Sequence, residues 1–334
     1  MLDTSADAPL QEPLLRVENL SVSFRTERGL LKAVENLSFS LAPGEILSVV
    51  GESGSGKSLT SLAVMGLIDD PNAVLSGSIR YRGRELVGLP KRELRDVRGN
   101  EIAMIFQDPM SAMTPVYTIG WQIAEQVRAH SKLTRRQARA RAVDLLGEMG
   151  MPNPGLQVDR FPHQLSGGMR QRAMIAMALS CNPSLLIADE PTTALDVTVQ
   201  AQILRLIEQL RRDHGSSIIF ITHDMGVVAE VADRVMVMYA GKVVERGPKP
   251  DLFATPGHPY TVGLLDSIPP MSGPKPHRLP AIAGAPPSIA GRPEGCPFGP
   301  RCRHVHDACL VDPPLYRRGL QDVSCYLVPE GVDA

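Results

Sequence analysis

Residues 46–58 read Ile-Leu-Ser-Val-Val-Gly-Glu-Ser-Gly-Ser-Gly-Lys-Ser, which is the most informative segment of the chain. Its largely apolar start is typical of a buried strand, and a glycine-rich turn leads from it into a helix. The turn fits the pattern G-x-x-x-x-G-K-[ST], with Gly51, Gly56, Lys57 and Ser58 at the fixed positions. Glycines let successive backbone N–H groups point inward, and a helix N-terminus adds partial positive charge. The stretch therefore predicts a phosphate-binding loop; a plain strand-to-helix turn is the weaker alternative.

A second strand end supplies the groups that would act on the phosphate. Residues 185–188 are apolar and run into Asp189 and Glu190, at the edge where open α/β sheets bind ligands. Lys57 is expected to reach the β- and γ-phosphates, and the Ser58 hydroxyl to ligate Mg²⁺ together with Asp189. Glu190 can polarise an attacking water. The alternative is that the two acids only solvate a strand end.

Composition and charge bound the class of protein. The 334 residues are 43% apolar and 21% charged, which is ordinary for a chain that buries a core. The formal net charge of -1 gives no bulk electrostatic reason to expect nucleic-acid binding. No apolar run approaches the ~20 residues that span a bilayer, and the acidic N-terminus lacks a signal-peptide pattern. We therefore expect a cytosolic protein that reaches a membrane through partner subunits.

The first third of the chain reads as a polar tail followed by strands. Residues 1–13 are predicted to be a disordered tail. Residues 14–24 alternate like a half-buried strand, and 77–86 repeat that pattern. The run 33–41 is followed by Ala-Pro-Gly and then by the strand that starts at Glu45, which predicts a hairpin between the two.

The remainder mixes helices and short apolar strands. Between about 110 and 164 the period is helical throughout, which looks like an insertion between strands of an α/β core. After about 247 the chain turns rich in proline and glycine. The predicted helices cover 59–67, 118–130, 134–151, 165–180, 197–214 and 259–267. Residues 90–99 are expected to form an exposed helix or loop. The predicted strands cover 101–106, 184–188, 217–222, 234–239 and 242–246.

Several motifs stand in the order typical of one family. They are the strand end at Gln107, Leu-Ser-Gly-Gly-Met at 165–169, Asp189–Glu190, Ala-Leu-Asp at 194–196 and Ile-Thr-His at 221–223. Together they resemble the nucleotide-binding subunit of ATP-binding cassette (ABC) transporters. The resemblance implies an α/β P-loop NTPase (RecA-like) domain over 14–250, with an antiparallel β-subdomain, a helical subdomain at about 110–180, and a loop-rich C-terminal cysteine extension over 251–334.

The resemblance also assigns roles to residues of this chain. The implied ATP-binding residues are Phe24, Gly51, Ser53, Gly54, Gly56, Lys57, Ser58, Leu59, Ser166, Gly167, Gly168 and Asp196. The implied catalytic residues are Lys57, Gln107, Glu190 and His223, and the implied Mg²⁺ ligands are Ser58, Gln107 and Asp189. Met169 stands where glutamine is commonest in the family, which keeps the backbone donors and removes one side-chain amide.

In this family two subunits sandwich two ATP molecules head to tail. The resemblance implies that 165–169 contacts the γ-phosphate held by the opposite subunit, and that Asp196 lies at the same junction. Gln107 would touch Mg²⁺ and connect to the membrane subunits, and His223 would orient the water. Phe24 would stack on adenine; a buried strand aromatic is the alternative.

The tail carries a cysteine cluster whose spacing fits no standard motif. Cys296, Cys302, Cys309 and Cys325 are separated by five, six and fifteen residues. A reducing cytosol argues against disulfides, and four thiolates suit zinc or a [4Fe–4S] cluster, between which the spacing does not decide. Cys181 is expected to be a small core residue.

The tail also resembles the C-terminal extension of ATPase subunits from dipeptide and oligopeptide importers. The resemblance rests on 258–261 (His-Pro-Tyr-Thr) and 295–302, and some members carry a [4Fe–4S] cluster on these four cysteines. It implies such a cluster here, with Zn²⁺ as the alternative; His304 and His306 are expected to be solvated.

The implied function is an ATPase that drives import of di- or oligopeptides. Its partners would be two integral membrane permeases, a second ATPase subunit (a paralogue) and, indirectly, an external solute-binding protein, with no nucleic acid. The chain would sit peripherally on the cytoplasmic face of the inner or plasma membrane. One alternative is another cargo, such as nickel or glutathione. The other is a soluble ABC ATPase acting on DNA or the ribosome, which usually has a long coiled-coil insertion or tandem cassettes.

Overall fold

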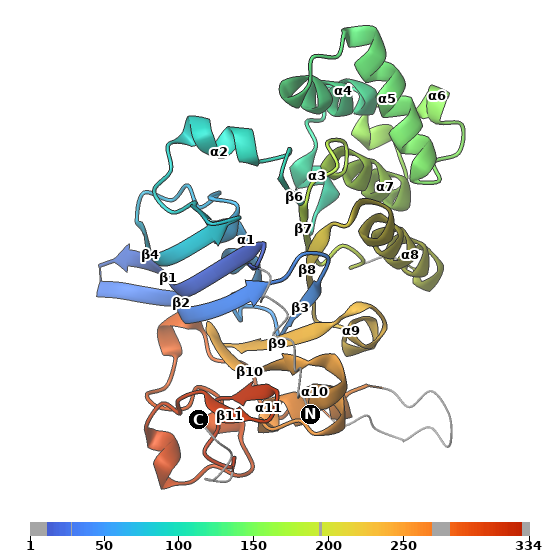
Figure 1. The fold of residues 1–334 in the computed structure, drawn as a ribbon. Helices are drawn as coiled ribbons and strands as arrows, with labels where there is room; N and C mark the ends of the chain where they lie inside the picture. The colour runs from blue at the N-terminus through green and yellow to red at the C-terminus, as the bar shows by residue number, and fades with distance from the viewer. Residues whose placement is uncertain (1–11, 28, 194–195, 269–280, 329–334) are drawn as a thin grey trace, which may run out of the picture.

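The computed structural model describes residues 12–27, 29–193, 196–268 and 281–328. Most of the predicted tail at 1–13, and Ala194 and Leu195 of one motif, lie outside the described residues. The described part holds two sheets, a helical insertion between strands, and a C-terminal extension (Figure 1).

The larger sheet carries the parallel strands. Its order is β11-β12-β10-β9-β3-β8-β7-β6, and β9, β3, β8, β7 and β6 run parallel. Its strands are β3 (Ile46–Val50), β6 (Ile102–Ile105), β7 (Leu185–Asp189), β8 (Ser217–Thr222), β9 (Arg234–Tyr239), β10 (Lys242–Pro248), β11 (Tyr316–Arg318) and β12 (Gln321–Val323). Every residue of β3, β7 and β8 is buried, which is why these strands read as apolar runs. The predicted β9–β10 hairpin is confirmed.

The smaller sheet is antiparallel, in the order β2-β1-β4-β5. Its strands are β1 (Leu15–Thr26), β2 (Gly29–Leu41), β4 (Ala73–Tyr81) and β5 (Arg84–Glu85). The predicted hairpin between 33–41 and the strand from Glu45 is wrong, because β2 pairs with β1 and the Ala-Pro-Gly turn crosses to the other sheet. The single strand predicted at 77–86 is also interrupted, by a turn at Arg82 and Gly83, both with positive φ.

The predicted helices are confirmed with shifts of a few residues at their ends. The helices are α1 (Lys57–Val64), α2 (Lys91–Val97), α3 (Pro109–Ala112), α4 (Ile119–His130), α5 (Arg135–Glu148), α6 (Pro154–Gln157), α7 (Gly167–Ala178), α8 (Val197–His214), α9 (Met225–Val231), α10 (Lys249–Ala254) and α11 (Pro259–Asp266). The side chains of Thr118 and Thr134 cap α4 and α5. The short helices α9 and α10 were not predicted, because seven and six residues are too few for a helical period to stand out in the sequence.

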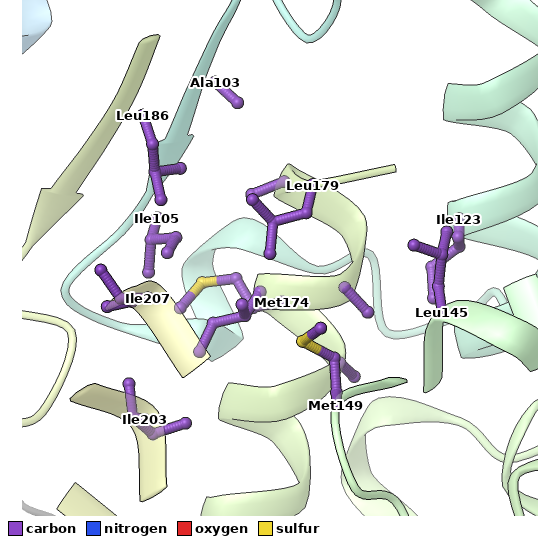
Figure 2. Close-up of a cluster of buried hydrophobic side chains, with 14 of the residues drawn as sticks. Ala103, Ile105, Ile123, Leu145, Met149, Met174, Leu179, Leu186, Ile203 and Ile207 are labelled. Carbon is purple, nitrogen blue, oxygen red and sulfur yellow. The ribbon is translucent and has the colours of Figure 1, made fainter. Parts of the chain in front are cut away.

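One hydrophobic core joins the parallel sheet to the helical insertion. Figure 2 shows side chains of β6 and β7 facing α7 and α8, with Ile123 of α4 and Leu145 of α5 to the right, beyond α7. Leu179, Met174 and Ile207 pack at the centre of this cluster and are 3% exposed or less. The insertion is therefore fastened to the core through α7, and the carboxyl ends of β6 and β7 are held by the same packing.

The C-terminal extension packs beside the other edge of the sheet. Its strand β12 pairs with β10, and an aromatic cluster of Tyr239, Tyr260 and Phe298 joins it to β9. Tyr239 and Tyr260 are fully buried. Among the described helices, none combines the length and the apolarity that crossing a membrane requires.

Candidate nucleotide site

Four adjacent strands deliver the predicted site residues to one edge of the parallel sheet. β3 leads into Gly51, β8 into His223, β7 ends at Asp189, and β6 is followed by Gln107. The strand order β3-β8-β7-β6 places these ends side by side. Because the carboxyl ends of parallel strands meet at one edge, site residues that are up to 172 positions apart in the sequence lie close together there.

The loop after β3 is held in shape by close backbone packing. A Cβ on Gly51 would lie 2.2 Å from the carbonyl oxygen of Met238, so this position accepts only glycine. Gly54 and Gly56 have φ of 78° and 98°, which favour glycine. Gly56 directly precedes α1, so the free N–H groups of the first turn of this helix open into the loop.

Lys57 lies inside this loop. Its ammonium donates to the carbonyl oxygens of Gly51 at 2.7 Å and Glu52 at 3.0 Å, and the side chain is buried. Burial lowers the pKa of Lys57, and the nearby carboxylates of Glu190 and Asp189 oppose that shift. A cation is thus held among carbonyls where a phosphate would meet it.

Asp189 is a buried carboxyl with an unused oxygen. Its Oδ1 has no hydrogen-bond partner within the described part of the chain, although the residue is only 4% exposed. Burial raises the pKa of Asp189, and the neighbouring Ser58 hydroxyl and the Lys57 ammonium act in the opposite direction. A buried oxygen without a partner, beside a hydroxyl, is the donor set that a divalent cation would satisfy.

The Glu190 carboxylate contacts three other polar side chains at the sheet edge. Its carboxylate accepts from the Gln107 amide at 3.1 Å and lies 3.4 Å from Nδ1 of His223. It also accepts from the Thr193 hydroxyl at 2.9 Å, a contact that no sequence motif predicts. Its backbone has φ of 47°, which a non-glycine residue adopts only when its surroundings impose it. Three side chains therefore fix one carboxylate at the sheet edge.

Other predicted residues lie on separate elements. Ser166 caps α7 and Asp196 caps α8, each through its side-chain oxygen, while Gly167 and Gly168 form the first turn of α7. Phe24 lies on β1, half-buried against the core of the smaller sheet. The predicted Ser53 and Ser58 are exposed, and Leu59 packs partly against the same core. The described contacts do not join the α7 and α8 caps to the phosphate loop of this chain.

The four tail cysteines line one cavity, which His258, Phe298 and His304 also border. All are free thiols. The backbone N–H of His304 points at Sγ of Cys302 at 3.4 Å, and that of Leu327 at Sγ of Cys325 at 3.5 Å. Burial raises the pKa of Cys325 to about 11, so a thiolate there requires a neighbouring positive charge.

A single metal ion does not fit this cavity as it stands. Nowhere in the described ranges do three or more His, Cys, Asp or Glu side chains lie close enough to hold one ion. The described residues therefore show no preformed metal site, and this finding does not decide between zinc and a cluster. His304 and His306 are exposed as predicted, and Cys181 is half-buried rather than a full core residue.

The extension also contacts the phosphate loop, which no motif indicated. Arg301 pairs with the Glu52 carboxylate through two nitrogens, at 2.5 and 3.0 Å. The hydroxyl of Tyr260 accepts from the backbone N–H of Glu52 at 2.8 Å. Nothing in the sequence signals these contacts, because the partners are more than two hundred positions apart.

Comparison with known proteins gives consistent matches along the chain. The family described as ABC transporter matches residues 34–193, and the one described as oligopeptide/dipeptide transporter, C-terminal region, matches 244–309. A putative peptide import ATP-binding protein of Brucella abortus is 52% identical over 91% of both chains. The dipeptide transport ATP-binding protein DppD of Escherichia coli is 48% identical, over 90% of this chain and 92% of its own.

Two further matches extend this result. The oligopeptide transport ATP-binding protein OppD of Haemophilus influenzae is 50% identical over 95% of this chain and 98% of its own. Among solved structures, a dimeric ATP-binding cassette in a post-hydrolysis state, bound to ADP and Pi, has a TM-score of 0.63 and 27% identity. It covers 70% of this chain and 98% of its own.

Proposed function

The chain belongs to the ABC transporter ATP-binding proteins of the oligopeptide/dipeptide import family, and we propose that it hydrolyses ATP to power import of di- and oligopeptides. The observation that carries the catalytic part of the proposal is Glu190, held by Gln107, Thr193 and His223 at the same sheet edge as Lys57. We assign the ATPase to residues 14–250, with a helical subdomain at about 110–180, and the extension to 251–334.

Each residue at the sheet edge has a separate task in this proposal. The N–H groups of the phosphate loop and the Lys57 ammonium bind the phosphates of ATP. Ser58, Gln107 and Asp189 hold Mg²⁺, which when bound offsets the negative charge of the phosphate oxygens. Glu190 orients and polarises the attacking water, and His223 keeps that carboxylate and the water in line with the γ-phosphorus.

A second ATPase subunit completes the site. Ser166 and Asp196 cap α7 and α8, and Gly167 and Gly168 form the first turn of α7. In the described part of the chain, none of these residues contacts the phosphate loop. The solved cassette with TM-score 0.63 is dimeric and bound to ADP and Pi. We therefore assign 165–169 and Asp196 to the γ-phosphate held by a neighbouring subunit, here a paralogue.

The partners follow from the family. Two integral membrane permeases would dock on the helical insertion near Gln107, with a solute-binding protein acting from outside. The chain would then lie peripherally on the cytoplasmic face of the inner or plasma membrane. Purified chain, paralogue and permeases in lipid vesicles should take up labelled dipeptide only when MgATP is on the ATPase side. Uptake of nickel or glutathione in its place would change the cargo and keep the ATPase role.

The cysteine cavity is proposed to hold a [4Fe–4S] cluster. Four thiols around one cavity match the ligand count of such a cluster, and the N–H groups aimed at Cys302 and Cys325 are the hydrogen bonds that cluster sulfurs receive. Anaerobically purified protein should contain about four iron and four sulfide per chain. A Cys302→Ser variant should lose both, while Cys181→Ser keeps them. Stoichiometric zinc without sulfide would contradict the assignment.

A further inference from the structure

A carboxylate inside a phosphate-binding loop needs an explanation. Glu52 follows the first glycine of the loop, its charge acts to raise the pKa of Lys57, and its backbone carbonyl accepts from the Lys57 ammonium. A triphosphate bound in the loop would be repelled by this carboxylate, because like charges in a partly buried site interact strongly. Something must neutralise Glu52 or hold it aside if the loop is to bind ATP.

Arg301 meets this requirement from the C-terminal extension. Its two terminal nitrogens donate one hydrogen bond to each carboxylate oxygen of Glu52, which is the strongest arrangement for a guanidinium and a carboxylate. The Arg301 side chain is 5% exposed and that of Glu52 28%, so solvent screens the pair little.

Arg301 is itself fixed by its surroundings. It donates to the carbonyl oxygens of Ala283 and Gly284 and to the Tyr239 hydroxyl, and its guanidinium lies over the Tyr239 and Phe298 rings. The residue ends the short 3-10 helix Gly299–Arg301, directly before Cys302. Contacts other than the one with Glu52 therefore fix the position of the guanidinium. This position depends on the loop that carries the cysteines.

The backbone of Glu52 is held as firmly as its side chain. Its N–H donates to the Tyr260 hydroxyl and its carbonyl accepts from Lys57. Tyr260 is fully buried on α11, so this contact too originates in the extension. Three groups of Glu52 are thus held by hydrogen bonds: its carboxylate, its N–H and its carbonyl. The partners of the first two belong to the extension.

We propose that Arg301 is a positioning residue of the ATP site, which neutralises Glu52 and holds it away from the phosphates. The inference rests on the proposed function, since it concerns the same nucleotide. It adds that the extension is part of the ATP site and not only an appendage. Arg301 does not touch the nucleotide in this account; it acts through Glu52.

The test is a cycle of variants in the full chain, with the dissociation constant for MgATP measured by calorimetry. Arg301→Ala leaves the carboxylate unpaired and should weaken MgATP binding about ten-fold, within the usual range for coupling between sites. Glu52→Gln removes the charge and should bind within about three-fold of wild type. In the double variant the loss caused by Arg301→Ala should disappear.

A matched control separates this role from simple anchoring. Arg292 makes a comparable ion pair with Glu35, at 3.0 Å and with 14% of its side chain exposed, and joins the extension to β2. Arg292→Ala should lower the melting temperature about as much as Arg301→Ala and leave MgATP affinity unchanged. If Arg301→Ala does not fold, Arg301→Lys keeps a charge without the paired geometry and should give a smaller loss that Glu52→Gln also removes.

Two results would overturn the inference. One is an Arg301→Ala variant that binds MgATP like the wild type. The other is a loss of affinity that persists unchanged in the Glu52→Gln background. If the wild-type chain itself fails to bind MgATP, the proposed function fails instead, so the two failures are distinguishable.

Discussion

The phosphate loop and the cysteine cavity each contain a glycine that packs tightly against a backbone carbonyl. The two regions differ in how their functional residues are distributed along the sequence. A Cβ on Gly51 would lie 2.2 Å from the carbonyl oxygen of Met238, and one on Gly295 would lie 2.4 Å from that of Cys309. The groups of the loop are contiguous, within residues 51–58. The cysteines of the cavity are spread over positions 296 to 325, and turns and a short strand pair lie between them.

The two regions differ in how far local sequence alone determines their geometry. A contiguous loop carries its own geometry, because its spacing fixes which N–H groups face the phosphate. The cavity depends on how the extension packs on β10, through the β10–β12 pairing. The contact between Arg301 and Glu52 joins the two regions, so a change in one is expected to reach the other.

The largest expected effect lies at the sheet edge. Glu190→Gln keeps the size of the side chain and removes the charge that polarises water, so ATP turnover should fall about a hundred-fold or more. MgATP binding should persist, because Lys57 and the loop N–H groups are intact. Phosphate release by the assembled transporter in vesicles measures this, with the exposed Glu230→Gln as the matched control. Unchanged turnover would remove Glu190 from the mechanism.

Gly51→Ala tests the contiguous loop directly. The added methyl overlaps a backbone carbonyl that cannot move aside, so we expect a loss of about 3 kcal/mol in the free energy of unfolding. MgATP binding should be lost with it. Gly54→Ala meets no atom within 4 Å and should cost only about 1–2 kcal/mol, from its positive φ. Urea unfolding of both variants decides; equal stabilities would show that the loop tolerates the overlap.

Gly295→Ala applies the same test to the cysteine cavity. Its methyl would displace the Cys309 backbone, so iron and sulfide content should drop by about half or more while α/β stability changes less. Gly319→Ala, which has open space and a similar positive φ, is the control. Iron analysis of the two anaerobically purified variants compares them. Equal, full iron in both would mean that the cavity does not depend on this close contact.

The smallest expected effect is at Phe24. If the ring stacks on adenine, Phe24→Ala should weaken MgATP binding by roughly 1 kcal/mol, about five-fold, and Phe24→Tyr should restore it. A half-buried strand aromatic without this role would change stability alone. Calorimetric binding and thermal unfolding, measured on the same samples, separate the two outcomes.

Much of the fold followed from residue patterns, for reasons visible in the structure. The strands β3, β7 and β8 are buried throughout and read as continuous apolar runs, and Thr118 and Thr134 marked two helix starts. The wrong hairpin after Leu41 has the opposite cause. An Ala-Pro-Gly turn predicts a reversal of the chain, but it does not say that the next strand joins a different sheet.

The position of a site residue was predictable where the residue belongs to a sequence motif. The residues from Gly51 to Ser58, the pair Asp189–Glu190 at the end of β7, and His223 all lie at one sheet edge. The hydroxyl of Thr193 was missed although it lies three positions after Glu190, because one threonine carries no pattern of its own. Arg301 is 249 positions from Glu52, and only the folded extension brings them together.

The decisive experiment compares MgATP binding by the purified wild-type chain with binding by the Lys57→Ala variant. The wild type should show one saturable site, and the variant should bind about a hundred-fold more weakly, because a buried cation that faces the phosphates is removed. Lys132→Ala, an exposed lysine in the helical insertion, should bind like the wild type. Equal MgATP affinity in the wild type and Lys57→Ala would contradict the claim that this loop holds the nucleotide.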